Sequence, residues 1–136
     1  MALTDEVRAF LNERRFAVLA TSNPNGTIQQ TVMWYLLDGD NIVMNTAKGR
    51  VKYRNIERNP TISICVEEGL RSVTIPGKVS INDDPVTGLA EIQRIGRRYD
   101  TEEEVRQAYE TNWKHQQRVT LTLPITRVVM HGFQAG

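Results

Sequence analysis

Cysteine, histidine and long apolar runs are scarce in this chain, and each scarcity excludes a class of structure or function. The single cysteine, Cys65, cannot form an internal disulfide, and its apolar surroundings predict a buried small side chain. Two distant histidines and this one cysteine do not make a ligand cluster, so we expect no metal site. No run approaches the roughly 20 apolar residues of a membrane-spanning helix. The first 15 residues include acids and lack an apolar core, unlike a signal peptide, so we expect a cytoplasmic protein without a membrane partner.

The chain also lacks an excess of charge of either sign. The formal net charge is +1 and charged residues make up 24% of the 136 residues. Such a balance provides no broad basic surface for nucleic acid, so we expect no nucleic-acid partner, and any basic function must be local. The length suits one core, and no linker or repeat interrupts it, which predicts a single domain over residues 1–136.

One local concentration of positive charge does occur. A short predicted helix begins at Thr46 and ends just before Pro60, with Lys48, Arg50 and Lys52 in its first turn. Cations are unfavourable there, because the exposed N–H groups and the macrodipole of a helix attract negative charge. An anion such as phosphate, held by N–H groups, a threonine hydroxyl and these cations, would explain the pattern. A solvated basic helix face is the alternative.

Predicted strands alternate with tight turns rather than with helices. We expect strands over 16–21, 27–37, 42–44, 61–66, 71–81 and 119–130, with a bend or edge at Pro76-Gly77 and a bulge or edge at Pro124. The turns at Asn25-Gly26 and Asp38-Gly39 favour antiparallel hairpins. A Rossmann fold is disfavoured, since strand–helix alternation and a glycine-rich fingerprint are absent. The fold class is therefore mainly β (α+β), a six-stranded antiparallel barrel with peripheral helices.

Helix caps and one two-sided strand complete the prediction. Helices are expected after Thr4, after Asp84-Pro85 and at the capping box that Thr101 and Glu104 form. The strand segment 32–37 is apolar on both faces. It must lie between two layers of the molecule, or between a barrel interior and a partner subunit, and the second arrangement predicts a homodimer.

Four passages, in their order and spacing, resemble the pyridoxamine 5'-phosphate oxidase-like split-barrel family, and more closely its small deazaflavin (coenzyme F420)-dependent branch. Together they span nearly the whole chain. They are Ala17–Thr21 with the Asn25-Gly26 turn and the strand ending at Tyr35; Asn45-Thr46 with Arg50, Lys52, Asn55 and Asn59-Pro60; Pro76–Ile81 with Asp83-Asp84-Pro85; and Arg98-Tyr99 with Arg118-Val119 and the strand through Pro124 and Val128.

The resemblance implies a six-stranded split barrel, a homodimer and a flavin-type cofactor in a cleft between the subunits. The implied reaction is hydride transfer between coenzyme F420 and a small organic acceptor. FMN as the cofactor, or a non-catalytic carrier or sensor of a flavin-type ligand, is the alternative. The implied phosphate site comprises Asn45, Thr46, Lys48, Arg50 and Lys52, and the ring would lie along Gln30, Thr31, Val32 and Met33, mostly against backbone.

The resemblance supplies no catalytic residue. The oxidases proper carry a C-terminal arginine–histidine pair for substrate phosphate, which Arg127 and His131 do not match, so that activity is not expected. We do not expect His115 or His131 to protonate a substrate. Trp34 and Trp113 are interpreted as core or interface residues rather than as ring-stacking residues.

Overall fold

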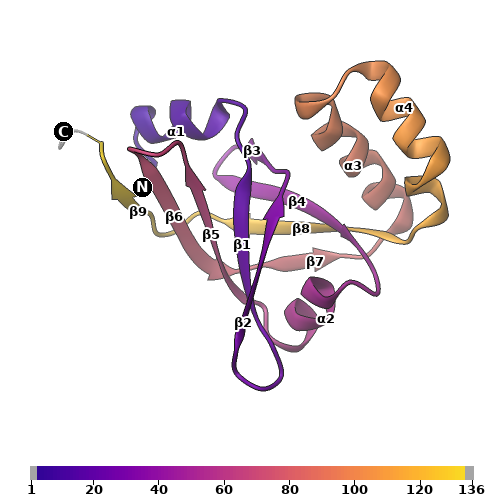
Figure 1. Cartoon of the computed structure of the whole chain (residues 1–136), viewed down its shortest axis with the longest axis horizontal. Coiled ribbons are helices and arrows are strands. Elements are labelled where there is room, and N and C mark those ends of the chain that lie inside the picture. Colours follow the sequence, from indigo (N-terminus) through magenta and orange to yellow (C-terminus); the bar gives the residue numbers. More distant parts are fainter. Residues whose placement is uncertain (1–2, 134–136) are drawn as a thin grey trace.

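A computed structural model of the chain describes residues 3–133. Its elements follow the order predicted from the turns and caps, with six strands of six or seven residues and three further strands of three residues in the described range (Figure 1). The elements are α1 (Asp5–Asn12), β1 (Ala17–Ser22), β2 (Ile28–Met33), β3 (Leu36–Asp38), β4 (Asn41–Ala47), α2 (Val51–Arg58), β5 (Thr61–Glu67), β6 (Ser72–Lys78), β7 (Ser80–Asn82), α3 (Pro85–Tyr99), α4 (Glu102–Thr111), the 3-10 turn η1 (Trp113–His115), β8 (Arg118–Pro124) and β9 (Val129–His131).

Two antiparallel sheets form the body of the protein. The first has the order β2-β1-β5-β6-β9 and the second has the order β3-β4-β8-β7. The chain crosses from one sheet to the other between β2 and β3, between β4 and β5 by way of α2, between β6 and β7, and between β8 and β9. The sheets do not close completely, and the predicted mainly-β split barrel with peripheral helices is confirmed.

Three of these crossings divide strands that the sequence predicted as continuous. The 27–37 strand is interrupted at Trp34-Tyr35, and the 119–130 strand ends at Pro124 before β9 begins. Of the bend or edge expected at Pro76-Gly77, the bend is absent, because Pro76 pairs with Ser63 inside β6 and the change of sheet occurs at Val79. The edge is present, because in the described chain β9 pairs only with residues 72–74 on the other side of β6.

Apolar side chains from both sheets fill the space between them. On β1, Ala17 and Leu19 face this core, and on β5 it is Ile62, Ile64 and Val66 that are buried. Cys65 lies on the opposite face of β5 and is only half-buried, so the predicted burial of this thiol is wrong. Its apolar neighbours in sequence belong to the core, whereas alternation along the strand turns Cys65 outward.

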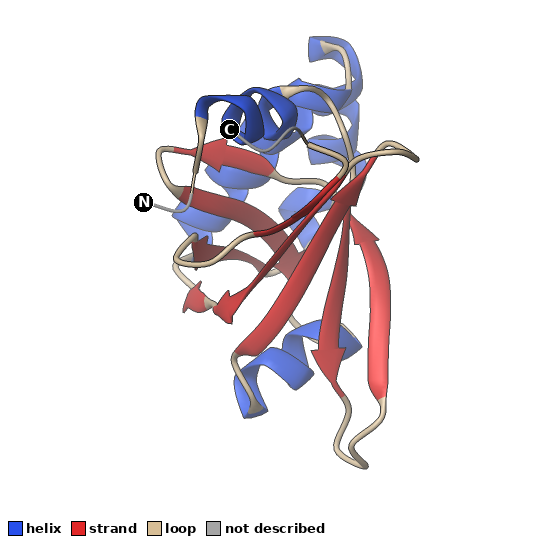
Figure 2. Cartoon of the chain, turned by 90° about the vertical axis from the view of Figure 1, so that its left-hand side faces the viewer, coloured by secondary structure: helices blue, strands red, loops and turns tan. Residues whose placement is uncertain are grey.

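The helices cover the ends and one flank of the sheets. Thr4 caps α1 by accepting a hydrogen bond from the Val7 N–H, and the buried face of α1 packs on the core, as predicted. Figures 1 and 2 place α1 and α2 at opposite ends of the molecule. The caps at Asp84 and Thr101 begin α3 and α4, and α3 packs on β4 and β8.

The two-sided segment 32–37 lies between two layers of this chain. Met33 and Tyr35 face the core between the sheets, whereas Leu36 packs with Val43 of β4 and Ile95 of α3. The predicted arrangement in which the segment lies between two layers of the same chain therefore describes most of it. No helix in residues 3–133 has the length and apolar character needed to cross a membrane.

Candidate functional site

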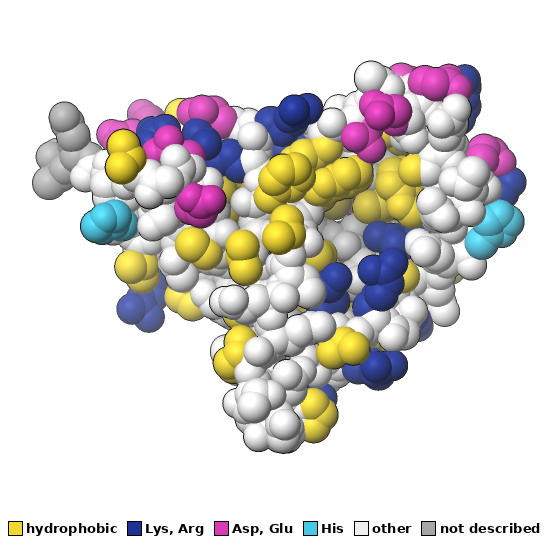
Figure 3. Space-filling view, viewed as in Figure 1, with side chains coloured by type: hydrophobic (Ala, Val, Ile, Leu, Met, Phe, Trp, Pro, Cys, Tyr) yellow, Lys and Arg dark blue, Asp and Glu magenta, His cyan; other side chains and the backbone are white. Residues whose placement is uncertain are grey.

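A cleft of about 300 Å³ opens between the end of β2, the β4–β8 pair and the α3–η1 side of the molecule. Figure 3 shows lysine and arginine side chains gathered in this hollow beside an apolar patch. The residues that line the cleft are Val32, Met33, Trp34, Asn45, Thr46, Arg50, Lys52, Ile92, Trp113 and Arg118.

The basic segment reaches the cleft by a different local structure from the one predicted. Helix α2 begins at Val51, with Arg50 as an N-cap residue that makes no side-chain capping hydrogen bond. The predicted helix start at Thr46 is wrong, because Thr46 is paired with Val119 inside β4. Of the three predicted first-turn cations, only Lys52 lies in the first turn, and Lys48 precedes the helix. The cations therefore collect where a strand gives way to a helix, rather than within the helix.

Arg118, the first residue of β8, provides the buried cation of the cleft. Arg118 as a whole is only 7% exposed. Its Nε donates to the Asn45 Oδ1 at 2.9 Å, and its Nη1 donates to the Gln116 Oε1 at 2.7 Å. The Asn45 amide donates in turn to the Gly88 carbonyl at 3.0 Å. The two bonds from Arg118 hold its guanidinium in place. They use two of its five N–H groups, and the others can donate to a ligand.

The three cleft cations have no acidic partner. Within residues 3–133, none of the ion pairs involves Arg50, Lys52 or Arg118. Burial, with a smaller contribution from the charge of Arg50, lowers the pKa of Arg118 to about 10. Burial first, and then the charges of Arg50 and Arg118, lower the pKa of Lys52. A desolvated cluster of like charges is unfavourable by itself and is relieved by a bound anion.

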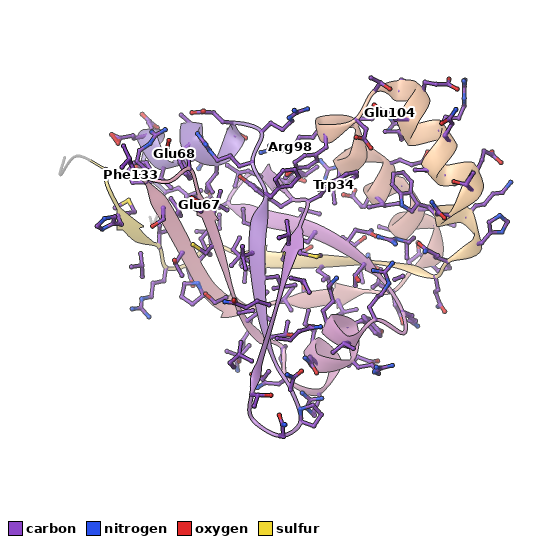
Figure 4. All side chains as sticks on the ribbon, viewed as in Figure 1. Trp34, Glu67, Glu68, Arg98, Glu104 and Phe133 are labelled. Atoms are coloured by element: carbon purple, nitrogen blue, oxygen red, sulfur yellow. The ribbon has the colours of Figure 1, made fainter. Side chains whose placement is uncertain are left out.

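The other side of the cleft is aromatic and aliphatic. Trp34, Ile92 and Trp113 provide it, and Trp34 stacks on Tyr99 with ring centroids 5.0 Å apart and planes inclined by 12°. Figure 4 shows Trp34 on the side of the sheets that faces α3 and α4. Both tryptophans of the chain line the cleft, so a planar ligand could contact an apolar wall while its anionic group meets the cations.

Six of the nine sequence-predicted cofactor residues line this cleft, namely Val32, Met33, Asn45, Thr46, Arg50 and Lys52. The other three lie elsewhere. Gln30 is exposed on β2, and Thr31 has a buried hydroxyl without a hydrogen-bond partner in the described chain. The Lys48 ammonium lies 3.6 Å from the Asp83 carboxylate. Their contacts with a cofactor remain predictions.

Four cleft residues were not predicted as site residues, namely Trp34, Ile92, Trp113 and Arg118. The sequence shows Arg118 as a charged residue immediately before an apolar strand, which draws notice to it but does not place it in the cleft. His115 and His131 are exposed. In the described part of the chain, no three histidine, cysteine or acidic side chains are grouped to hold a metal ion.

Comparison with known proteins identifies the family of this chain. The family model for pyridoxamine 5'-phosphate oxidase matches residues 3–131. A solved F420 reductase is 28% identical over 93% of this chain and 98% of that chain, with a TM-score of 0.77. The conserved hypothetical protein Rv2991 of Mycobacterium tuberculosis is 24% identical over 100% of this chain and 92% of its own, with a TM-score of 0.77.

General Stress Protein 26 of Bacillus anthracis str. Sterne is 15% identical over 95% of this chain and 94% of that chain, with a TM-score of 0.66, and shares the fold alone. The family model covers nearly the whole chain, and the matched folds extend over nearly the whole of it as well. This chain belongs to the pyridoxamine 5'-phosphate oxidase-like split-barrel family and resembles its F420-reductase branch.

Proposed function

We propose that this protein is an oxidoreductase that transfers a hydride between coenzyme F420 and a small organic acceptor. The observation that carries the proposal is Arg118, a buried cation without an acidic partner, beside Arg50 and Lys52 in the cleft. Membership of a family of flavin-type oxidoreductases and the similarity to a protein named F420 reductase support the choice of chemistry. FMN is the alternative cofactor.

The donor set of the cleft fits the phosphate of either cofactor. Phosphate oxygens are acceptors only, and the cleft offers two guanidinium groups, an ammonium group and the Thr46 hydroxyl. The N-terminal N–H groups of α2 follow directly after Arg50, which leaves them without a side-chain cap. A carboxylate in the cleft would compete for these donors, and the lining residues include none.

The cofactor supplies the hydride chemistry when it is bound, and the chain supplies orientation. Arg118, held by Asn45 and Gln116, fixes the position of the anionic group. Val32 and Met33 border the same cleft, which suits a ring lying along β2. Trp34 and the α3–η1 wall keep water from the apolar side.

A homodimer with the cofactor at the subunit interface is part of the proposal. The outer face of the five-stranded sheet supports it, because one row of neighbouring residues crosses all five strands without a charge: Val32, Val18, Cys65, Thr74 and Val129. Val32 is 67% exposed in the single chain while it also lines the cleft. A second copy seated on this row would cover Val32 and narrow the cleft.

A parallel titration with F420 and FMN tests the proposed function. Both tryptophans line the cleft, so quenching of their fluorescence reports binding directly. Binding of F420 alone, followed by oxidation of reduced F420 in the presence of conjugated acceptors, is the expected result. Tight binding of FMN alone would move the activity to FMN. Binding of either cofactor without turnover would favour the carrier or sensor function, and binding of neither would refute the site.

A further inference from the structure

Helix α2 and strand β2 contribute different walls to the proposed cofactor site. Lys52 of α2 and the preceding Arg50 provide cations. Val32 and Met33 of β2 border the side along which the ring is proposed to lie. The two elements are connected through β1, on which α2 packs and with which β2 pairs (Figure 1). The separation between the cations and β2 therefore depends on how α2 is attached to β1 and to the turn that joins β1 to β2.

A buried asparagine makes this attachment. Asn55 lies in the middle of α2 and is only 2% exposed. Its side-chain amide donates to the Thr21 Oγ1 at 3.0 Å and to the Asn23 Oδ1 at 2.9 Å. Its Oδ1 accepts from the Arg58 guanidinium, which also donates to the Ser22 carbonyl. Both amide hydrogens of Asn55 therefore bond to acceptors at the end of β1.

Two chains of hydrogen bonds continue from Asn55 to β2. The buried Thr21 hydroxyl donates to the Gln29 Oε1 at 3.3 Å, and these two residues lie opposite each other in the β1–β2 pair. The Asn23 amide donates to the Thr27 Oγ1 at 3.0 Å, one residue before β2 begins. Side chains thus connect α2 to β2 by two routes.

These hydrogen bonds restrict α2 in a way that its apolar contacts do not. Tyr53 and Ile56 are the buried apolar side chains of α2. Apolar contact is non-directional, so it permits a helix to tilt or slide, whereas a hydrogen bond requires a narrow range of distance and angle. Lys52 precedes Asn55 by three residues, about 4.5 Å along the helix axis, so a tilt of α2 about Asn55 would displace the Lys52 ammonium.

We propose that Asn55, Thr21 and Gln29 are positioning residues that set the separation between the cleft cations and β2. These three residues are not among those that line the cleft, so they act on the cofactor through α2 and β2 rather than by touching it. The inference rests on the proposed function, because a ligand benefits from this separation only if its anionic group meets the cations while its ring lies along β2. A site whose two parts are already correctly spaced binds such a ligand with a smaller loss of conformational freedom.

Thr21→Val tests the proposal, because it keeps the size of the side chain but removes the hydroxyl that joins Asn55 to Gln29. Tryptophan-quenching titrations with F420 and with FMN should give a Kd about three- to tenfold above the wild-type value, as for one lost hydrogen bond. Thr21→Ser retains the hydroxyl and should bind within about twofold of the wild type.

Tyr35→Phe is the matched control. It also removes one buried hydrogen bond, which the Tyr35 hydroxyl donates to the Leu11 carbonyl at 2.8 Å. This bond lies beside α1, at the opposite end of the molecule from α2 (Figure 1). Tyr35→Phe should lower the melting temperature, as Thr21→Val does, but it should leave the cofactor Kd unchanged.

Two further measurements distinguish positioning from a merely structural effect. In the Lys52→Ala background, Thr21→Val should raise the Kd by a smaller factor than in the wild type, because one of the cations that α2 positions is absent. In the ligand-free protein, the amide NMR resonance of Lys52 should shift in Thr21→Val and stay in place in Tyr35→Phe.

Three outcomes would overturn the proposal: an unchanged Kd in Thr21→Val, equal factors in the two backgrounds, or an unshifted Lys52 resonance in Thr21→Val. The NMR measurement needs no cofactor, so it tests the positioning even if the wild type binds neither F420 nor FMN. A shifted Lys52 resonance in that case would support the positioning residues and refute the proposed function alone.

Discussion

Replacing Arg118 with methionine distinguishes two effects of this buried cation. One is its effect on the free energy of unfolding, and the other is its contribution to the free energy of ligand binding. A pKa of about 10 for an arginine, whose ordinary value lies above 12, means that its charged form costs roughly 3 kcal/mol in the folded protein. Methionine removes that cost but also removes the hydrogen bonds to Asn45 and Gln116. An orphaned Asn45 oxygen costs about 1–3 kcal/mol. The two effects nearly cancel, so the free energy of unfolding without ligand should change by less than about 2 kcal/mol.

Cofactor affinity should respond differently to the same substitution. Loss of a charged hydrogen-bond donor costs about 1.5–3 kcal/mol, which is roughly a 10- to 150-fold increase in Kd. Urea denaturation of the cofactor-free protein and tryptophan-quenching titration of the same preparation give the two numbers. Arg118→Lys keeps the charge without the forked geometry and should give an intermediate Kd.

Two results would refute this reasoning. A Kd within twofold of the wild-type value would show that Arg118 does not contact the anionic group. A loss of stability equal to the loss of binding would show that Arg118 acts on the fold rather than on the ligand.

Three further predictions concern neighbouring groups. Lys52→Ala should weaken cofactor binding by about 1.5–3 kcal/mol while the melting temperature without ligand stays unchanged or rises; an unchanged Kd in calorimetry would contradict the phosphate site. Gly88→Ala should destabilise the protein by more than the about 1–3 kcal/mol of ordinary overpacking, because its Cβ would lie 2.0 Å from the Arg118 carbonyl oxygen; wild-type stability in urea would contradict that close approach. Burial raises the pKa of Tyr35 to about 12, above its ordinary value of about 10. Its contribution to stability is thus complete below pH of about 10 and is lost as the pH rises towards 12, so the difference in stability between the wild type and Tyr35→Phe should shrink over that range, and a constant difference would contradict it.

Local signals in the sequence predicted the starts of α1, α3 and α4 and most of the strands. Caps at Thr4, Asp84 and Thr101 are short-range features, because the capping side chain and the N–H group it accepts from lie three residues apart. The crossings between the sheets were not predicted. Trp34 and Tyr35 continue an apolar strand pattern, and only the packing of two sheets and α3 requires the strand to break there.

The proposed anion site was likewise only partly visible in the sequence, because its cations are neighbours in sequence but its geometry depends on contacts between distant residues. The cluster of cations at positions 48–52 is visible in the sequence, but its placement depends on how far β4 extends. Thr46 prefers a cap position by local chemistry, whereas its pairing with Val119 retains it in the strand. Arg118 could not be assigned to the cleft from the sequence, because it meets the β4 end only through the pairing of Ala47 with Arg118, far apart in the chain.

In the proposed site, a chain of buried hydrogen bonds through Asn45 holds the Arg118 guanidinium in position without a ligand. The Gly88 carbonyl orients the Asn45 amide, the Asn45 oxygen orients the Arg118 guanidinium, and each bond lies where water is largely excluded. The free energy needed to remove the guanidinium from water is therefore already spent in the folded protein. A bound anion offsets this penalty, and the offset strengthens binding. A flexible surface cation would have to be ordered and desolvated during binding. The same chain links α3 to the cleft, so a substitution at Gly88 should raise the cofactor Kd even though residue 88 does not line the cleft.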